Sequence, residues 1–251
     1  WLRFLITALF KGTDVSSADL ESVVPDIHEF GRKGKGNIYN PVHGTYFIKT
    51  HWLFDTSRDV FNSVNKCVYI LRNPMDVLAS HLNFVRFDHD GQRQRFIDAF
   101  IEEGGAPQWF PHLMGSWRDN ALSWIRGPKE SIVVIYEDML SSPVNELSKI
   151  SDFLQQNISS GKLEELVDAY KFETLQKKEA VELAQKTDGL FKDFSENRAE
   201  KSHFIQMGRA NYFREFLSDE SVDSARRVFI SQMKDIEAAL GHQIKSWSIF
   251  D

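Results

Sequence analysis

The sequence predicts an α/β protein with a central parallel sheet flanked by helices, and three observations lead to this prediction. Two short runs, 67–71 and 131–136, are apolar and rich in β-branched residues, as the buried strands of parallel sheets are. Apolar residues at helical spacing follow each of these runs. Strands that alternate with helices are typical of a parallel sheet, because parallel neighbours need a crossover connection.

The composition narrows the class of protein. The chain has 251 residues, which fits one large α/β domain or two small ones, and we expect a single domain over residues 1–251. Of these residues, 42% are hydrophobic and 20 are phenylalanine, which supplies a sizeable core. A single cysteine, Cys67, excludes an internal disulfide framework and fits a reducing compartment, so we expect a cytoplasmic protein. The net charge of −6 argues against a dominant nucleic-acid surface, and no apolar run reaches the length of a membrane span.

The first fifty residues are predicted to form a helix and a strand with irregular segments between them. Residues 1–12 repeat apolar side chains at helical spacing and end at a glycine, which favours a helix C-terminus. Residues 13–30 are acidic and are expected to be irregular, because Pro25 breaks any helix. The basic glycine run at 31–36 is either a phosphate cradle or, as we favour, a surface loop. Residues 46–51 have the pattern of a second strand.

The strand predicted at 46–51 ends in polar residues that suit catalysis. In open parallel sheets, ligand groups lie just beyond the carboxyl ends of the strands. Lys49 and His51 are two residues apart, so on an extended chain their side chains point to the same side. A cation beside a base is a candidate catalytic pair, and the alternative is that His51 is structural.

The turn after the strand at 67–71 is a candidate phosphate site. Asn73 is a good N-cap, and Pro74 suits the first position of the helix that follows. Free backbone N–H groups and the helix dipole favour an anion at such a turn. Arg72 adds a forked cation and Ser80 adds a hydroxyl donor. The alternative is an ordinary strand–turn–helix unit whose arginine pairs with a carboxylate.

The rest of the chain is predicted to be mainly helical. Residues 86–112 form either a functional loop or a small helical insertion. Further helices are expected within the segments 52–66, 117–124, 144–154, 163–178 and 225–240. Residues 185–203 carry few apolar anchors and are expected to form a mobile loop. In the segment that follows, Gly208 and Arg209 could meet an anion, and the alternative is a plain loop.

Taken together, these stretches resemble the cytosolic sulfotransferases that depend on 3′-phosphoadenosine-5′-phosphosulfate (PAPS), over nearly the whole chain. Five short motifs occur in the order found in that family. They are Lys49-Thr50-His51, Arg72-Asn73-Pro74-Met75-Asp76 with Ser80, Gly115-Ser116-Trp117, Tyr136-Glu137-Asp138-Met139, and Phe172 in Tyr-Lys-Phe-Glu-Thr-Leu. The fold that this resemblance implies is a P-loop NTPase-like three-layer architecture.

The resemblance also implies an activity. Members of the family move a sulfuryl group from PAPS to a hydroxyl or amine of a small-molecule acceptor, leave adenosine 3′,5′-bisphosphate (PAP), and need no metal. By this resemblance, His51 would be the catalytic base, and Lys49 would stabilise charge on the transferred group. Arg72 and Ser80 would anchor the 3′-phosphate. The adenine pocket would be formed by three aromatic residues, Trp1, Tyr136 and Phe172.

Two departures from the family pattern bear on the site. The family's 5′-phosphosulfate loop ends just before a tryptophan that opens a helix, and Trp1 resembles that tryptophan. The loop and the strand before it are absent from the sequence, and we expect that the numbering starts after an omitted segment. Where the family has Arg-Lys-Gly, this chain has Gln206-Met207-Gly208, and Arg209 is expected to supply the missing cation to the 3′-phosphate.

Two other functions stay open, a P-loop-fold nucleotide or small-molecule kinase and a non-catalytic nucleotide-binding domain. The acceptor would lie among the variable segments 13–45, 86–112 and 185–203, whose aromatic content suggests an apolar or aromatic acceptor. We expect no nucleic-acid partner. A monomer and a homodimer both fit, because the family's usual dimer motif is not found near residues 211–222.

Overall fold

The structure is a computed structural model that describes residues 1–28, 45–85, 87–196, 204–205 and 208–250. Backbone contacts divide the chain into two compact units. The first unit comprises residues 1–50 and 142–208, and the second unit comprises residues 51–141 and 209–251. Each unit has its own buried core. The predicted glycine run at 31–36 lies outside the described residues.

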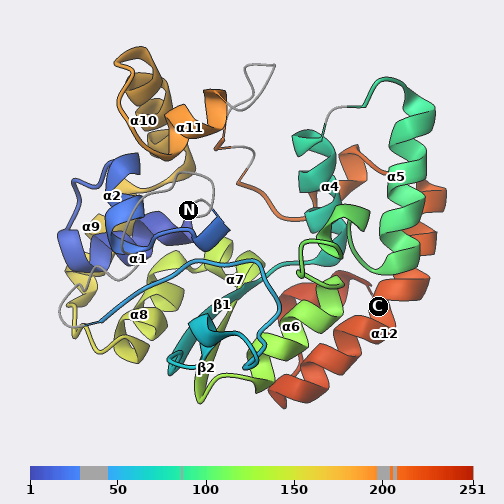
Figure 1. Ribbon diagram of the computed structural model, residues 1–251, viewed down its shortest axis with the longest axis horizontal. Helices are drawn as coiled ribbons and strands as arrows, with labels where there is room; N and C mark the ends of the chain where they lie inside the picture. The colour runs from blue at the N-terminus through green and yellow to red at the C-terminus, as the bar shows by residue number, and fades with distance from the viewer. Residues whose placement is uncertain (29–44, 86, 197–203, 206–207, 251) are drawn as a thin grey trace. The chain divides into compact units, whose positions relative to one another are not determined.

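The sheet of the second unit is built from the two predicted strands. Strands β1 (Lys66–Leu71) and β2 (Glu130–Ile135) run parallel, with pairs from Lys66 and Glu130 to Leu71 and Ile135 (Figure 1). Helices α6 and α7 pack against these strands, so the α/β prediction with a parallel sheet flanked by helices is confirmed. Because both strands end at the same edge, the residues that follow them become neighbours.

Helix starts in the second unit follow local capping signals. Asn73 caps α4 (Pro74–Phe84), because its side-chain oxygen accepts a hydrogen bond from the Met75 N–H at 2.9 Å. Ser116 caps α6 (Trp117–Arg126) in the same way through the Asp119 N–H at 3.1 Å. Both helices were expected from these residues. The region at 86–112 is helical rather than a plain loop, because α5 (Asp90–Glu103) occupies its centre.

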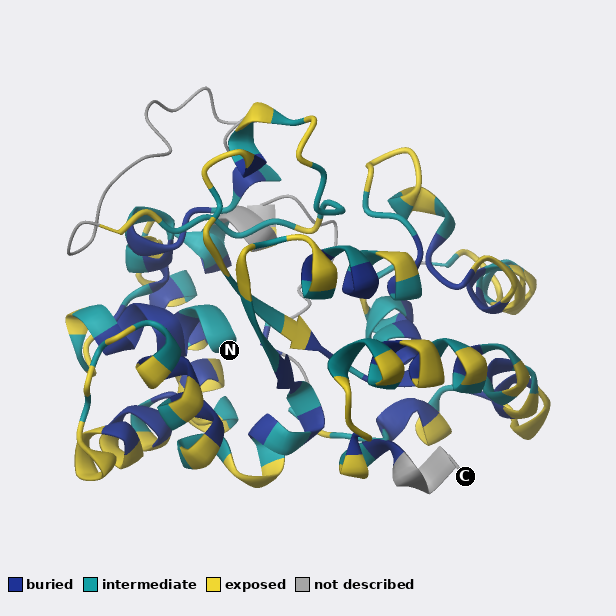
Figure 2. Cartoon of the chain, turned by 90° about the horizontal axis from the view of Figure 1, so that it is seen from below, coloured by how far each residue is buried: buried dark blue, intermediate teal, exposed yellow. Residues whose placement is uncertain are grey.

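The remaining elements of the second unit complete its core. They are η1 (Asp59–Phe61), η2 (Pro107–Trp109), α7 (Tyr136–Ser141), η3 (Tyr212–Glu215), α12 (Asp219–Leu240) and η4 (Lys245–Phe250). Helix α12 packs on α5 and α6, and its Phe229 contacts the rings of Phe100 and Trp117. In Figure 2, buried residues run along one side of the helices and exposed residues along the other, as amphipathic packing requires.

The first unit is described by its helices. They are α1 (Leu2–Lys11), α2 (Ser17–Val23), α8 (Pro143–Phe153), α9 (Ser160–Ala169), α10 (Phe172–Ala184) and α11 (Leu190–Glu196). Phe4 of α1 lies at the centre of their core, with its ring stacked on Tyr170 and on Phe191, each at 5.8 Å between ring centres. Helix α1 ends at Lys11 with Gly12 as its C-cap, as predicted.

Four expectations about secondary structure are corrected. The segment 13–30 is not irregular throughout, because Ser16 and Asp19 form a capping box that starts α2. The strand at 46–51 is reduced, among the described residues, to isolated bridges, one of which pairs Lys49 with Asp26. The predicted helix at 163–178 is two helices, because the chain leaves helical geometry at Tyr170. The loop at 185–203 contains α11.

Candidate functional site

The turn after β1 places Arg72 against two phenol rings. Its guanidinium carbon lies 4.2 Å from the centre of the Tyr136 ring and 5.1 Å from the centre of the Tyr212 ring. Its Nη2 donates a hydrogen bond to the carbonyl oxygen of Arg209 at 3.0 Å. Arginine binds aromatic faces by cation–π attraction, so its guanidinium is held in one orientation.

Asp76, in the first turn of α4, is a buried carboxylate next to Arg72. It has no exposed surface, and its Oδ2 lies 3.9 Å from Arg72 Nη2. Its two oxygens accept hydrogen bonds from the backbone N–H groups of Asn211 at 2.6 Å and Phe213 at 3.0 Å. Burial raises the pKa of Asp76, and Arg72 and these N–H groups oppose that rise. The alternative to a phosphate site was an arginine that pairs with a carboxylate, and Asp76 is such a carboxylate. Its shortest contacts, however, are to backbone N–H groups.

Glu137, which follows Tyr136, is a second buried carboxylate of this site. Its Oε1 accepts a hydrogen bond from the Asn73 N–H at 3.0 Å, so it ties α7 to the turn that carries Arg72. Its Oε2 is buried and has no hydrogen-bond partner in the described part of the chain. Burial raises the pKa of Glu137 despite the nearby Arg72. The motif around Tyr136 pointed to this segment, but nothing in the sequence predicted this contact.

Ser80 lies one turn beyond Asp76 on α4 and is partly buried. Burial raises the pKa of the Tyr212 phenol, whereas Ser80 and Arg72 lower it, which places both polar groups close to the phenol oxygen. The structure therefore brings together three predicted residues, Arg72, Ser80 and Tyr136, and adds Tyr212, to which no motif in the sequence pointed.

His51 is exposed and belongs to the second unit. Its carbonyl oxygen accepts a hydrogen bond from the Asn120 side-chain amide at 2.9 Å, and the same amide donates to the Met114 carbonyl oxygen at 2.7 Å. The Asn120 oxygen in turn accepts from the Tyr69 hydroxyl at 3.1 Å. Asn120 on α6 thus fixes the backbone at His51, a role that the sequence did not reveal.

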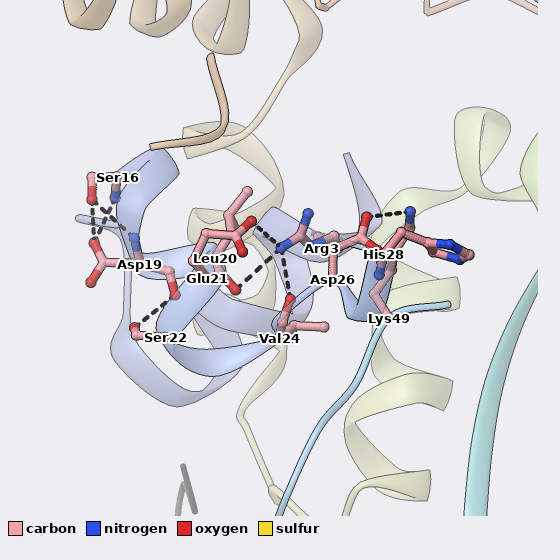
Figure 3. A network of polar contacts seen from close by, with 10 residues as sticks. All are labelled: Arg3, Ser16, Asp19, Leu20, Glu21, Ser22, Val24, Asp26, His28 and Lys49. Carbon is pink, nitrogen blue, oxygen red and sulfur yellow. Dashed lines mark hydrogen bonds and ion pairs between the residues drawn. The ribbon is translucent and has the colours of Figure 1, made fainter. Parts of the chain in front are cut away.

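Lys49 belongs to the first unit, so the predicted pair with His51 is divided between the two units. Its Nζ lies 2.5 Å from Asp26 Oδ2, and the Lys49 side chain is 25% exposed. The other Asp26 oxygen accepts from the His28 N–H at 3.0 Å. Figure 3 shows Asp26, His28 and Lys49 beside Arg3, whose Nη2 donates to the carbonyl oxygens of Leu20 and Val24. The ammonium of Lys49 is therefore held by a carboxylate that the sequence did not predict.

Three other predicted residues of the first unit lie together. The rings of Trp1 and Phe172 are 5.3 Å apart at their centres, with their planes tilted by 53°. Gly208 has a φ of +57°, and a Cβ added to it would meet Phe172 Cγ at 2.3 Å. Only a glycine can bring the backbone this close to the ring. Trp1, Phe172 and Gly208 thus form one aromatic corner. The resemblance puts Trp1 and Phe172 in the adenine pocket together with Tyr136, which belongs to the second unit, and puts Gly208 at the 3′-phosphate, so these roles stay predictions.

A buried carboxylate holds the chain just before Gly208. Glu179 on α10 is 1% exposed, and its two oxygens accept hydrogen bonds from the backbone N–H groups of Phe204 at 2.6 Å and Ile205 at 3.0 Å. Gln206 and Met207 lie outside the described residues. The two terminal guanidinium nitrogens of Arg209 donate to the Glu215 carboxylate at 2.9 and 3.0 Å. The expected contact of Arg209 with the 3′-phosphate stays a prediction.

The described residues contain no group of three or more His, Cys, Asp or Glu side chains placed to hold a metal ion. Within the same residues, no helix combines the length and the apolar character that a membrane span requires.

Comparison with known proteins identifies relatives over most of the chain. The sulfotransferase domain family matches residues 4–237. Flavonol 3-sulfotransferase of Flaveria bidentis is 22% identical over 247 residues, which cover 89% of this chain and 74% of the relative. Luciferin sulfotransferase of Photinus pyralis is 23% identical, covering 74% of this chain and 50% of the relative. Amine sulfotransferase of Oryctolagus cuniculus is 24% identical, covering 69% of this chain and 56% of the relative. The chain thus spans between half and three quarters of the length of these relatives.

Two solved structures have a fold similar to that of this chain. Retinol dehydratase in complex with androsterone and the inactive cofactor PAP superposes with a TM-score of 0.55 at 22% identity, covering 78% of this chain and 55% of that one. A mouse sulfotransferase in complex with PAP superposes with a TM-score of 0.58 at 18% identity, covering 78% of this chain and 68% of that one. At these identities the likeness establishes the fold, which is the predicted α/β architecture.

Proposed function

This chain belongs to the sulfotransferase domain family, and from that premise we propose that it moves a sulfuryl group from PAPS to a hydroxyl or amine of a small-molecule acceptor. The observation that carries the proposal is the position of Arg72 at the turn between β1 and α4, stacked on Tyr136 and close to Ser80. The relatives named as sulfotransferases and the similar structures that hold PAP support it.

Arg72 and Ser80 are proposed to anchor the 3′-phosphate of the nucleotide. Arg72 follows the end of a parallel strand and precedes α4, where the helix dipole favours an anion. Its guanidinium can grip two phosphate oxygens at once, which a lysine cannot do. Anchoring the 3′-phosphate fixes the far end of the nucleotide, so the sulfur is presented in line with the acceptor. Positioning of this kind supplies much of the rate in transfers of charged groups.

His51 is proposed to take the proton from the acceptor hydroxyl or amine. The acceptor atom forms the new bond to sulfur, the bond between sulfur and the bridging phosphate oxygen breaks, and its electron pair leaves with PAP. General-base assistance of this type contributes about 10²- to 10⁴-fold.

Lys49 is proposed to stabilise negative charge on the transferred group. Its ammonium lies 2.5 Å from Asp26 Oδ2, so a sulfuryl oxygen would have to share Lys49 with this carboxylate.

The aromatic residues are proposed to receive the adenine base. Trp1 and Phe172 already pack together, and Gly208 leaves room for the backbone to approach them. Base–aromatic stacking is worth about 1–3 kcal/mol for each base. Tyr136 and Arg209 complete the proposed set for the nucleotide. Residues 1–251 are proposed to act as one sulfotransferase domain, because the family match spans both units.

The remaining properties are also proposals, which rest on the family, on the aromatic content of the variable segments and on the single cysteine. The co-substrate is PAPS, and the transfer uses no metal. The acceptor is an apolar or aromatic small molecule, the protein acts in the cytoplasm, and it is a monomer or a homodimer.

The proposal is tested by thermal stabilisation and by transfer. We expect PAP to raise the melting temperature more than adenosine 5′-phosphate does, and ATP with magnesium to have a smaller effect than PAP. Transfer of labelled sulfate from PAPS to phenols, alcohols or amines should then be detected. Preferential stabilisation by ATP with magnesium would indicate the kinase alternative. Binding of PAP without transfer to any acceptor would indicate a non-catalytic nucleotide-binding domain.

A further inference from the structure

Tyr212 is a buried tyrosine that faces the predicted phosphate anchor. It opens η3, and it is 4% exposed. The Arg72 guanidinium carbon lies 5.1 Å from its ring centre and 4.2 Å from that of Tyr136. A guanidinium that is attracted to two ring faces has little freedom to turn.

Asp76 fixes Tyr212 at three points. The Tyr212 hydroxyl donates a hydrogen bond to the Asp76 carbonyl oxygen at 3.2 Å. The Asp76 carboxylate accepts from the N–H groups of Asn211 at 2.6 Å and Phe213 at 3.0 Å, the residues on either side of Tyr212. Both the tip of the side chain and the backbone around it are therefore tied to the first turn of α4.

Arg72 is held by the same segment but keeps donors for a ligand. Its Nη2 bonds to the Arg209 carbonyl oxygen at 3.0 Å. Its Nε is buried and has no hydrogen-bond partner among the residues that the structure describes. A guanidinium carries five N–H donors, and an unpaired buried donor favours the arrival of an acceptor oxygen.

We propose that Tyr212 is a positioning residue for Arg72, which fixes the plane of the guanidinium so that its N–H fork faces the 3′-phosphate of the nucleotide. This inference rests on the proposed function. Tyr212 acts on binding through Arg72. Its removal therefore weakens binding only of nucleotides that carry a 3′-phosphate.

The test compares the dissociation constants of PAP and adenosine 5′-phosphate for the unaltered protein and two variants. Tyr212→Leu removes the ring and should weaken PAP binding about tenfold, because a partly desolvated cation–π contact is lost. Tyr212→Phe keeps the ring and the backbone contacts to Asp76 but removes the hydroxyl that bonds to the Asp76 carbonyl oxygen, and roughly a threefold loss is expected. Binding of adenosine 5′-phosphate should stay within about twofold for both variants. Tyr69→Phe is the matched control, because it removes a hydroxyl that bonds to Asn120 in the same unit.

A double-mutant cycle separates positioning from a merely structural role. If Tyr212 acts through Arg72, neither Tyr212 change weakens PAP binding further in an Arg72→Ala background. Additive losses in that background, or equal losses for the two nucleotides, would overturn the inference. If Tyr212→Leu does not fold, Tyr212→Phe in both backgrounds decides the question, because it retains the buried ring.

The same data separate the two claims. An unaltered protein that does not prefer PAP to adenosine 5′-phosphate would contradict the proposed function. A preference that Arg72→Ala abolishes and both Tyr212 variants retain would contradict only the role of Tyr212.

Discussion

The guanidinium of Arg72 lies 4.2 Å from the centre of the Tyr136 ring, although the two residues follow different strands. They meet because β1 and β2 are parallel and in register, with Leu71 paired to Ile135. The residue after each strand is therefore placed at one edge of the sheet. The contact links the predicted phosphate anchor to a residue that was expected in the adenine pocket, so one strand edge serves two parts of the proposed nucleotide site.

Glu137→Gln should stabilise the protein at neutral pH. Burial raises the pKa of Glu137 in the folded state, so the folded protein favours the protonated form more than the unfolded chain does. Its contribution to stability is fully present below the unfolded pKa and is lost as the pH rises through the folded pKa. A glutamine keeps the oxygen that accepts from Asn73 and carries no charge, so its advantage over glutamate should grow above about pH 4.5.

Melting temperatures between pH 4.5 and pH 8 measure this difference. Asp138→Asn is a suitable control, because no hydrogen bond or ion pair of that side chain is found among the described residues. A Glu137→Gln variant that loses stability relative to the unaltered protein as the pH rises would contradict the assignment of a raised pKa.

Gly208→Ala should disrupt the aromatic corner of the first unit. The new methyl group would collide with Phe172, since the built Cβ lies 2.3 Å from Cγ of that ring, and φ is +57°. A left-handed backbone alone costs an alanine about 1 kcal/mol, and the collision adds to this. Gly12→Ala is the matched control, because Gly12 also has a positive φ but a Cβ there would meet nothing within 4 Å.

Binding of adenosine 5′-phosphate and the melting temperature are the two measurements. We expect Gly208→Ala to weaken binding of this nucleotide at least about fivefold, because the ring that is proposed to receive the base is displaced. Gly12→Ala should lower only the melting temperature. Equal effects of the two substitutions on binding would show that the corner does not hold the base.

Asn120→Ala should lower the rate of transfer without weakening nucleotide binding. The Asn120 amide bonds to the His51 carbonyl oxygen at 2.9 Å, and its loss frees the backbone that carries the proposed base. A base displaced by about 1 Å can lose roughly 10²-fold in rate. Asn65→Ala is the control, because Asn65 is exposed and its side-chain amide donates to the Ser63 carbonyl oxygen at 3.5 Å. A turnover number equal for both variants would argue that Asn120 does not position His51.

His51→Ala should abolish transfer and leave binding of PAP nearly intact. The imidazole is proposed to remove the acceptor proton, a contribution of about 10²- to 10⁴-fold, and it is not proposed to contact the nucleotide. Steady-state transfer and PAP titration on the same sample measure both properties. Equal loss of transfer and binding would mean that His51 supports the fold of the site rather than the chemistry.

The parts of the fold and site that follow from the sequence are those set by local signals. The strand at 67–71, the cap at Asn73 and the helix from Pro74 each depend on a few consecutive residues, and all three are confirmed. The nearness of Arg72 and Tyr136 then follows from parallel pairing. The capping box that starts α2 is also a local signal. The prediction of an irregular segment rested on Pro25 and did not use this signal.

The parts that could not be predicted depend on residues far apart in the chain. The Tyr212 hydroxyl reaches the Asp76 carbonyl oxygen across 136 residues, and no spacing rule connects such positions. The predicted strand at 46–51 had a suitable pattern, yet strand formation also needs a neighbour to pair with. The structure describes a backbone bridge between Lys49 and Asp26. The same two residues also form an ion pair, which the sequence did not predict.

The most direct test of the account is the selectivity of Arg72→Ala between two nucleotides. Dissociation constants of PAP and adenosine 5′-phosphate are measured for this variant, for the unaltered protein and for Arg118→Ala, whose arginine pairs with Asp235 elsewhere in the same unit. We predict that Arg72→Ala weakens PAP binding roughly 10- to 100-fold, as loss of a charge-assisted contact does, and changes binding of adenosine 5′-phosphate by no more than about twofold. A uniform loss for both nucleotides would contradict the claim that Arg72 binds the 3′-phosphate.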